Sequence, residues 1–199
     1  MKGLFLFLLI ISPVLAGGVS CGGGKTSVAT PVPVASVTPA KGGGEEMTIE
    51  LTSSAFVAGG AIPAKYTCNG EGTSPPLQWT SPPTGAQSLA LVVDDPDAPN
   101  GTFVHWVIYD LPPDARGLPE GVPTDGSLAD GSLNGKNGAN KLGYTGPCPP
   151  SGTHHYHFKL YALDAKLDAA AGWSKDQLLA AMQGHILAQG ELVGLYSKQ

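Results

Sequence analysis

Alternating and continuous runs of apolar residues along the chain predict a mainly β domain. Met47–Thr52 alternates apolar with polar residues, which predicts a first strand with one buried face. Ser88–Val93 is continuously apolar and is typical of a central strand buried on both faces. Alternation returns in Thr102–Leu111 and His155–Leu163, and Glu191–Tyr196 is predicted as a last strand. We expect these strands to supply most of the core.

Strand alternation also assigns side chains to faces, because successive residues of a strand point to opposite sides. The predicted strand at 102–111 has two sets of side chains, with Phe103, His105, Val107 and Tyr109 on one face and Val104, Trp106 and Ile108 on the other. Near the strand that ends at Leu163, His154 and Tyr156 share one side and His155 and His157 share the other.

One helix is predicted near the C-terminus. Ser174–Gln177 resembles a capping box, in which serine and glutamine side chains bond free backbone N–H groups of the first turn. Apolar residues then recur at helical spacing, at Leu178, Leu179, Met182, Ile186 and Leu187. The pattern predicts a helix that begins after Ser174 and continues toward Gly190.

The segment Pro112–Thr153 lacks a sustained apolar period. It holds nine glycines and seven prolines in 42 residues, so it is predicted to be mostly loop. A loop of this length in a compact domain is normally functional or disordered, and this one ends beside the histidines at 154–157.

The start of the chain predicts export. Residues 1–20 combine one lysine, a short apolar run and small residues, as in a signal peptide, and the run is too short to span a bilayer. Cleavage before Cys21 would leave a lipoprotein acylated on that cysteine, and cleavage after Ala16 would leave a soluble periplasmic or secreted product. We favour acylated Cys21, a lipid anchor and a bacterial cell envelope location.

Residues 21–46 are predicted to connect that anchor to the domain. They are rich in glycine and proline and contain no aromatic residue, so they cannot bury enough apolar surface to fold. The predicted organisation is therefore a signal peptide at 1–20, acylated Cys21 with a flexible tether at 21–46, and one domain at 47–199.

The charge of the chain narrows the possible partners. The formal net charge is -5 and Arg116 is the single arginine, which argues against a nucleic acid partner because phosphate backbones require a basic surface.

The cysteines indicate a disulfide. With Cys21 assigned to the lipid, Cys68 and Cys148 remain. An even pair in an oxidising compartment is usually a disulfide, and the alternative is two separate buried thiols.

Asp94–Pro99 and the histidines carry the candidate chemistry. Three aspartates follow a buried strand, and the apolar neighbours of His105 imply a buried imidazole, for which a carboxylate is the expected partner. His155 and His157 are the candidates for a metal pair, but a transition-metal site would also need a third ligand, and none lies at a recognised spacing near them. We therefore predict no metal site and no cofactor.

At these positions the chain resembles the phosphatidylethanolamine-binding protein family, also called Raf-kinase-inhibitor-like. Asp95–Pro99 followed by His105-Trp106, and Gly146–Pro150 leading to His154-His155-Tyr156, carry the resemblance. Two further segments, Ile62–Gly70 and Ser74–Leu77, resemble the bacterial branch of the family. One position departs from the family, because an arginine is common where this chain has His155.

The resemblance implies a β-sandwich with a long Gly/Pro-rich loop and a C-terminal helix, and with a small anion site. Carried over residue by residue, the implied ligand-binding set is Asp95, Asp97, His105, Gly146, Pro149, His154 and Tyr156. We assign Asp95 and Asp97 to orient His105, His154 and nearby N–H groups, while His154, Tyr156 and amides around Gly146 donate to phosphate-like oxygens.

The expected function is therefore non-catalytic binding of a small anionic or zwitterionic ligand, such as a phosphate-like group or a phospholipid headgroup. One alternative is a protease inhibitor or signalling module that contacts a protein partner through Pro112–Thr153. A second is a hydrolase, which we rank lower because there is no Gly-x-Ser-x-Gly motif and the cysteines would be paired.

Overall fold

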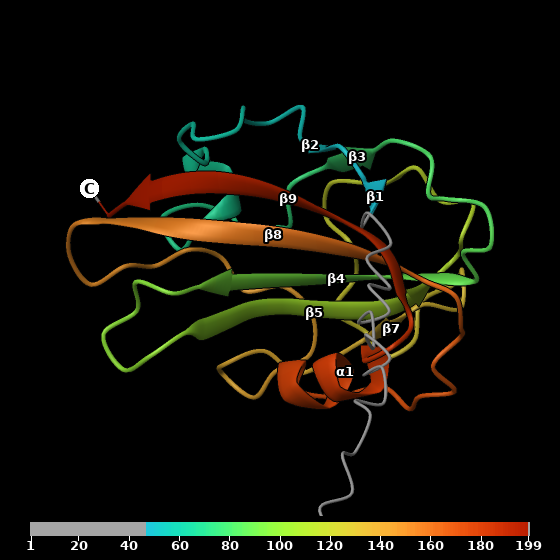
Figure 1. The fold of residues 1–199 in the computed structure, drawn as a ribbon. Helices are drawn as coiled ribbons and strands as arrows, with labels where there is room; N and C mark the ends of the chain where they lie inside the picture. Colours follow the sequence, from blue (N-terminus) through green and yellow to red (C-terminus); the bar gives the residue numbers. More distant parts are fainter. Residues whose placement is uncertain (1–46, 199) are drawn as a thin grey trace, which may run out of the picture. The chain divides into compact units, whose positions relative to one another are not determined.

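The computed structural model describes residues 47–198, and within them strands dominate (Figure 1). The predicted signal peptide, Cys21 and the tether lie outside the described residues. The elements in chain order are β1 Met47–Thr48, β2 Leu51–Thr52, a 3-10 helix Ala64–Tyr66, β3 Leu77–Trp79, β4 Ser88–Asp95, β5 Phe103–Leu111, β6 Gly117–Leu118, β7 Leu133–Asn134, β8 Thr153–Leu163, α1 Lys175–Met182 and β9 Ile186–Ser197. No described helix is long and apolar enough to cross a membrane.

Two sheets share one core. The larger sheet has six strands in the order β1-β9-β8-β4-β5-β7, and the smaller has three in the order β2-β3-β6. Leu51, Leu77, Trp79 and Leu118 of the small sheet belong to the same buried cluster as the inner face of the large sheet. The mainly β class is confirmed. The narrower description as a sandwich stays a prediction, because the strands of the small sheet have only two or three residues.

The central strand β4 is buried along its whole length, as its continuous apolar run predicts. Leu89, Leu91 and Val93 face the first core. Ala90 and Val92 face a second core, in which Leu178 and Met182 of α1 are also buried. Because both faces of the strand are covered, the segment Leu89–Val93 is apolar at every position, which explains the absence of alternation there.

The first predicted strand divides into two. Met47–Thr48 pairs in parallel with β9, whereas Leu51–Thr52 pairs antiparallel with β3 in the other sheet. The chain passes between the sheets at Ile49, which is buried and donates its N–H to the Gln189 carbonyl at 2.9 Å. Ile49 and Leu51 are buried in the shared core as predicted, but Met47 is 52% exposed, so the predicted buried face begins only at Ile49.

The predicted face assignment of β5 is wrong at its centre. Val93 pairs with Trp106 but Asp94 pairs with Val104, so His105 is an extra residue in β5 and forms a bulge. A bulge reverses the alternation. His105 therefore packs against Tyr156 on the side of the first core, whereas Tyr109 is buried in the second core.

The helix begins as predicted but ends early. The Ser174 side chain accepts from the Gln177 N–H, and the Gln177 side chain accepts from the Ser174 N–H, so the capping box is present. The helix stops at Met182, and Gly184 with φ of +81° turns the chain. Residues 186 and 187 therefore belong to β9, which pairs with β8 from Leu163 to Thr153.

The Gly/Pro-rich segment contains two strands of two residues, β6 and β7, and is otherwise irregular. Asn134 is fully buried and holds it to the large sheet. Its amide donates to the carbonyls of Pro123 and Asp125 at 2.9 and 2.8 Å, and its carbonyl oxygen accepts from the Trp106 indole at 3.0 Å. These bonds satisfy polar groups that burial would otherwise leave unpaired.

Candidate functional site

The aspartates at the end of β4 and in the turn after it hold the first residues of β8. Asp95 is buried, and its Oδ2 accepts from Nδ1 of His154 at 2.7 Å, while its Oδ1 accepts from the Asp97 N–H at 2.8 Å. Asp97 Oδ2 accepts from both the N–H and Nδ1 of His155, at 2.9 and 2.7 Å. These contacts form because β4 and β8 are antiparallel neighbours.

Asp95 and Asp97, which were predicted to share one orienting role, therefore have different partners. Asp95 orients His154, as expected. Asp97 orients neither His105 nor His154 and bonds instead to His155, on the other side of β8. Hydrogen bonds from the His155 ring and backbone lower the pKa of the exposed Asp97 carboxyl. A histidine thus forms a carboxylate pair at the position where the family commonly has arginine.

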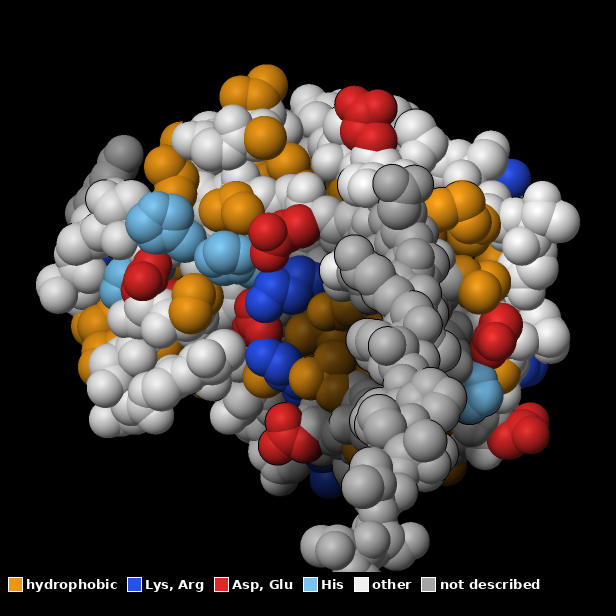
Figure 2. Space-filling model, in the orientation of Figure 1, with side chains coloured by type: hydrophobic (Ala, Val, Ile, Leu, Met, Phe, Trp, Pro, Cys, Tyr) orange, Lys and Arg blue, Asp and Glu red, His pale blue; other side chains and the backbone are white. Residues whose placement is uncertain are grey.

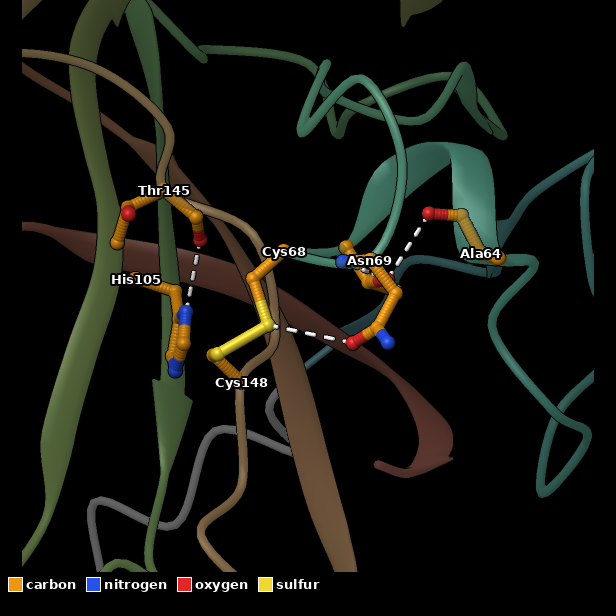
Figure 3. Close-up of a disulfide and its surroundings, with 7 residues drawn as sticks. Ala64, Cys68, Asn69, His105, Thr145 and Cys148 are labelled. Carbon is orange, nitrogen blue, oxygen red and sulfur yellow. Dashed lines mark hydrogen bonds between the residues drawn. A yellow bond between two sulfur atoms is a disulfide. The ribbon is translucent and has the colours of Figure 1, made fainter. Parts of the chain in front are cut away.

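His105 does not have the carboxylate partner that its buried setting predicts. Its Nδ1 lies 2.7 Å from the Thr145 carbonyl, and Figure 3 shows this hydrogen bond beside the disulfide. Because a carbonyl only accepts, Nδ1 carries the hydrogen. Burial lowers the pKa of the His105 imidazole, although the Thr145 carbonyl and the nearby Asp95 carboxylate act in the opposite direction. The neutral ring therefore presents an unprotonated Nε2.

A cavity of about 220 Å³ lies where these groups meet. Both His105 and His154 line it, and since each Nδ1 is bonded within the protein, each Nε2 is the nitrogen open to a ligand. The lining residues are Asp95, Ala98, Pro99, Phe103, His105, Thr145, Gly146, Cys148, Pro149, Pro150 and His154. Larger hollows of about 480 and 700 Å³ lie elsewhere, and no histidine lines either of them.

Tyr156 lies between the two histidines rather than on the cavity lining. Its ring meets His105 edge-on at 5.1 Å between centroids and is stacked with His154 at 6.5 Å. The hydroxyl is buried and has no hydrogen-bond partner within residues 47–198. Burial raises the pKa of Tyr156, and the charges of Asp95 and Asp97 raise it further, so the hydroxyl keeps its proton.

Gly146 and Pro149 lie in the segment Gly146–Pro150, which lines one side of the cavity and is called the cavity wall below. A disulfide at Cys148 fixes this segment. Cys68 and Cys148 are bonded, with 5.4 Å between their Cα atoms, which confirms the predicted pairing (Figure 3). A Cβ atom on Gly146 would lie 2.8 Å from the Tyr66 carbonyl oxygen, so only glycine fits this approach. The wall is thereby fixed against the segment that contains Cys68.

Several cavity residues were not among the predicted ligand contacts: Ala98, Pro99, Phe103, Thr145, Cys148 and Pro150. Pro99 and Pro150 lie within the motifs that carry the family resemblance. Phe103 is two positions before His105, so strand alternation placed both on one face. Thr145 acts through its backbone carbonyl, and its side-chain type gives no sign of that role.

The described residues offer no cluster of three or more His, Cys, Asp or Glu side chains that could hold a metal ion. What residues 47–198 do contain is a mainly β domain with a small cavity, lined by two histidines whose rings are each fixed through Nδ1. This combination defines the class as a β protein with a small, mostly apolar cavity into which two fixed histidines are set.

Comparison with known proteins identifies the family. The sequence model of phosphatidylethanolamine-binding proteins matches residues 52–197, and the chain belongs to that family. It is 53% identical over 150 residues to the UPF0098 protein of Methanothermobacter thermautotrophicus, covering 75% of this chain and 99% of that one. Relatives from Chlamydia match as well. Because the matches come from organisms as different as Methanothermobacter and Chlamydia, the assignment to a bacterial branch stays a prediction.

Solved structures agree with this assignment. A phosphatidylethanolamine-binding protein homologue from Chlamydia trachomatis has a TM-score of 0.71 and 44% identity, over 76% of this chain and 99% of that chain. YbcL of E. coli has a TM-score of 0.71 and 30% identity over the same shares of the two chains.

Proposed function

We propose that this protein is a non-catalytic binding protein whose cavity takes the phosphate-like group of a small anionic or zwitterionic ligand, phospholipid headgroups included. The observation that carries the proposal is the presence of His105 and His154 on one cavity with both Nδ1 atoms already bonded. Two fixed Nε2 atoms limit the ligand to a compact polar group. A rigid site also loses little conformational entropy on binding.

The two histidines would play different parts. His154, bonded to the Asp95 carboxylate, is the side chain that donates to a phosphate-like oxygen once its ring is protonated. Neutral His105 offers an acceptor at Nε2, which suits a hydroxyl of a protonated phosphate or the ammonium group of phosphoethanolamine. The Tyr156 hydroxyl, which is buried and has no partner within residues 47–198, is a further donor next to the two rings.

This division keeps the aspartates in the positioning role expected from the sequence. Both Asp95 oxygens accept bonds from within the protein, and Asp97 bonds to His155. We therefore assign Asp95 and Asp97 to positioning and not to ligand contact. The cavity volume of about 220 Å³ equals the share of roughly seven water molecules in liquid, enough for a phosphate group and a short substituent.

Titration calorimetry with inorganic phosphate and with phosphoethanolamine tests the proposal. The wild type should bind with one site per chain, and His154→Ala should weaken binding at least about 10-fold, the loss of one charge-assisted hydrogen bond. His185→Ala is the control, because His185 is exposed and bonded to Asp164 away from the cavity. Binding by His154→Ala that equals the wild type would contradict the assignment of the cavity.

A further inference from the structure

Two histidines on the outer face of β8 form a second polar cluster that the proposed function does not use. His155 and His157 are two residues apart in a strand, so their side chains lie on the same side. They are 53% and 26% exposed as side chains. Figure 2 shows histidine side chains gathered beside acidic and lysine side chains over this part of the molecule.

Each of these rings is bonded to a carboxylate from a different neighbouring segment. Nδ1 of His155 lies 2.7 Å from Asp97, in the turn after β4, and Nδ1 of His157 lies 2.8 Å from Glu191 of β9. An ionised carboxylate only accepts, so each Nδ1 carries the hydrogen and each Nε2 has the lone pair. Neither Nε2 has a hydrogen bond within the described part of the chain.

This is the arrangement by which proteins prepare histidine for a metal ion. A ligating imidazole almost always donates its second ring N–H to a carboxylate or carbonyl, which fixes the ring and strengthens the nitrogen as a ligand. Both His155 and His157 show this pattern, and they are neighbours on one face of β8. The sequence predicted no metal site here because no third ligand lies at a recognised spacing, and it could not show these carboxylates, which come from residues 58 and 34 positions away.

The charges around the pair also favour a cation. Asp97 and Glu191 add two negative charges beside the rings. The nearest lysine on the same face of β8 is Lys159, whose ammonium group is bonded to the buried carboxylate of Asp94 together with that of Lys175. Both lysines therefore point toward Asp94.

We propose that His155 and His157 form a surface site for a divalent transition-metal ion, with Cu²⁺ bound most tightly. The two Nε2 atoms supply the protein ligands and water completes the coordination, because no third such ligand converges within residues 47–198. Tetragonal N,O coordination suits Cu²⁺, which also leads the general order of affinities among divalent first-row ions. Structural Zn²⁺ sites instead need four protein ligands.

Titration of Cu²⁺, Ni²⁺ and Zn²⁺ chlorides into the untagged full chain with Cys21→Ser tests this site without a free thiol. We expect one Cu²⁺ per chain, bound more tightly than the other two ions. His155→Ala and His157→Ala should each weaken Cu²⁺ binding at least about 10-fold. Asp97→Asn and Glu191→Gln should weaken it about 10-fold, the lower end of the range for groups that orient metal ligands.

His185 provides a matched control. It is bonded through Nδ1 to Asp164 at 2.8 Å and is similarly exposed, but it has no second histidine two residues away. His185→Ala should leave Cu²⁺ binding unchanged. Electron paramagnetic resonance of the bound Cu²⁺ should show coupling to two imidazole nitrogens in the wild type and to one in His155→Ala.

Three results would overturn the proposal. The first is Cu²⁺ affinity in the His155→Ala, His157→Ala double variant that equals the wild type. The second is loss of Cu²⁺ binding in His154→Ala with the outer pair intact, which would move the ion to the cavity. The third is no Cu²⁺ binding to the wild type at micromolar protein. Circular dichroism spectra equal to the wild type would show that each variant is folded.

Discussion

The two cavity histidines differ in what holds their Nδ1 atoms, and this difference controls what each Nε2 offers. His154 donates to a carboxylate, so a negative charge lies beside its ring. His105 donates to an uncharged carbonyl in a buried position, and burial lowers the pKa of its imidazole. One cavity therefore contains a ring with an anionic partner and a ring that is neutral near pH 7.

The neutral state of His105 should make stability depend on pH. Unfolding exposes the ring and returns its pKa to about 6.5, so below that pH the unfolded state binds a proton that the folded state resists. The His105 contribution is complete above pH 6.5 and is lost as the pH falls toward the folded pKa. Its slope cannot exceed about 1.4 kcal/mol per pH unit, the value for one proton.

Urea denaturation between pH 5 and 8 measures this dependence, with His105→Gln compared with the wild type. The difference in the free energy of unfolding between the two proteins should shrink as the pH falls through 6.5. His185→Gln serves as the comparison for an exposed histidine. A difference that is independent of pH would mean that His105 is not held neutral by burial.

At the scale of elements, long-range ion pairs connect β8 with its neighbours. On its outer face, Asp94 of β4 bonds Lys159 of β8 and Lys175 of α1. Burial alone would raise the pKa of Asp94, but hydrogen bonds and charge from Lys175 and Lys159 outweigh burial and lower it. The pair of lysines therefore keeps a buried carboxylate ionised and holds the helix start against the sheet.

The Cys68–Cys148 disulfide likewise holds the cavity wall in place through a long-range contact. It joins residues 80 positions apart, so its removal should lower the free energy of unfolding by about 2–5 kcal/mol. The Cys68→Ala, Cys148→Ala variant should also bind phosphate more weakly, because Cys148, Gly146 and Pro149 line the cavity.

Urea denaturation and phosphate calorimetry check both effects. Both proteins should carry Cys21→Ser, so that no other cysteine can form a bond. Reduction of the disulfide-containing protein with dithiothreitol should reproduce the stability loss of the double variant. Equal stability with and without the disulfide would show that the wall is held by its other contacts, such as the Cys68 N–H to Pro147 carbonyl bond at 3.0 Å.

At the scale of the whole molecule, the predicted anchor at Cys21 lies outside the part of the chain that the family shares. The family match covers 52–197 and does not extend to the N-terminal segment. We propose that the chain is exported and anchored by a lipid at Cys21, with residues 22–46 as a spacer. A phospholipid headgroup would then lie within reach of the cavity.

Cys21→Ser tests the anchor. The wild type should sediment with the membrane fraction of expressing bacterial cells, and mass spectrometry should show an acylated N-terminal cysteine. The variant should lose the acyl group and leave the membrane fraction, because its remaining segment lacks a lipid. Thermal unfolding of the two purified proteins should be equal, since residue 21 lies outside the domain. Membrane association that persists in the variant would contradict lipid anchoring.

Sequence pattern was enough to predict the strands β4, β5 and β8, the capping box at Ser174, the disulfide, and an aspartate of the Asp94–Pro99 turn as the partner of His154. Each depends on local pattern, on counting or on a motif shared by a family. Local pattern failed where distant contacts decided the outcome. The helix ended at Met182 because pairing with β8 placed Ile186 in a strand, and the bulge at His105 reversed the faces of β5.

The partners of His105, His155 and His157 depend on how the chain folds. Thr145 is 40 residues from His105, Asp97 is 58 from His155, and Glu191 is 34 from His157. Residue type and spacing carry no information about a backbone carbonyl or a carboxylate that strand pairing brings in from so far away. For this reason the sequence indicated which residues carry the chemistry, and the fold determined which ring nitrogens are open to a ligand.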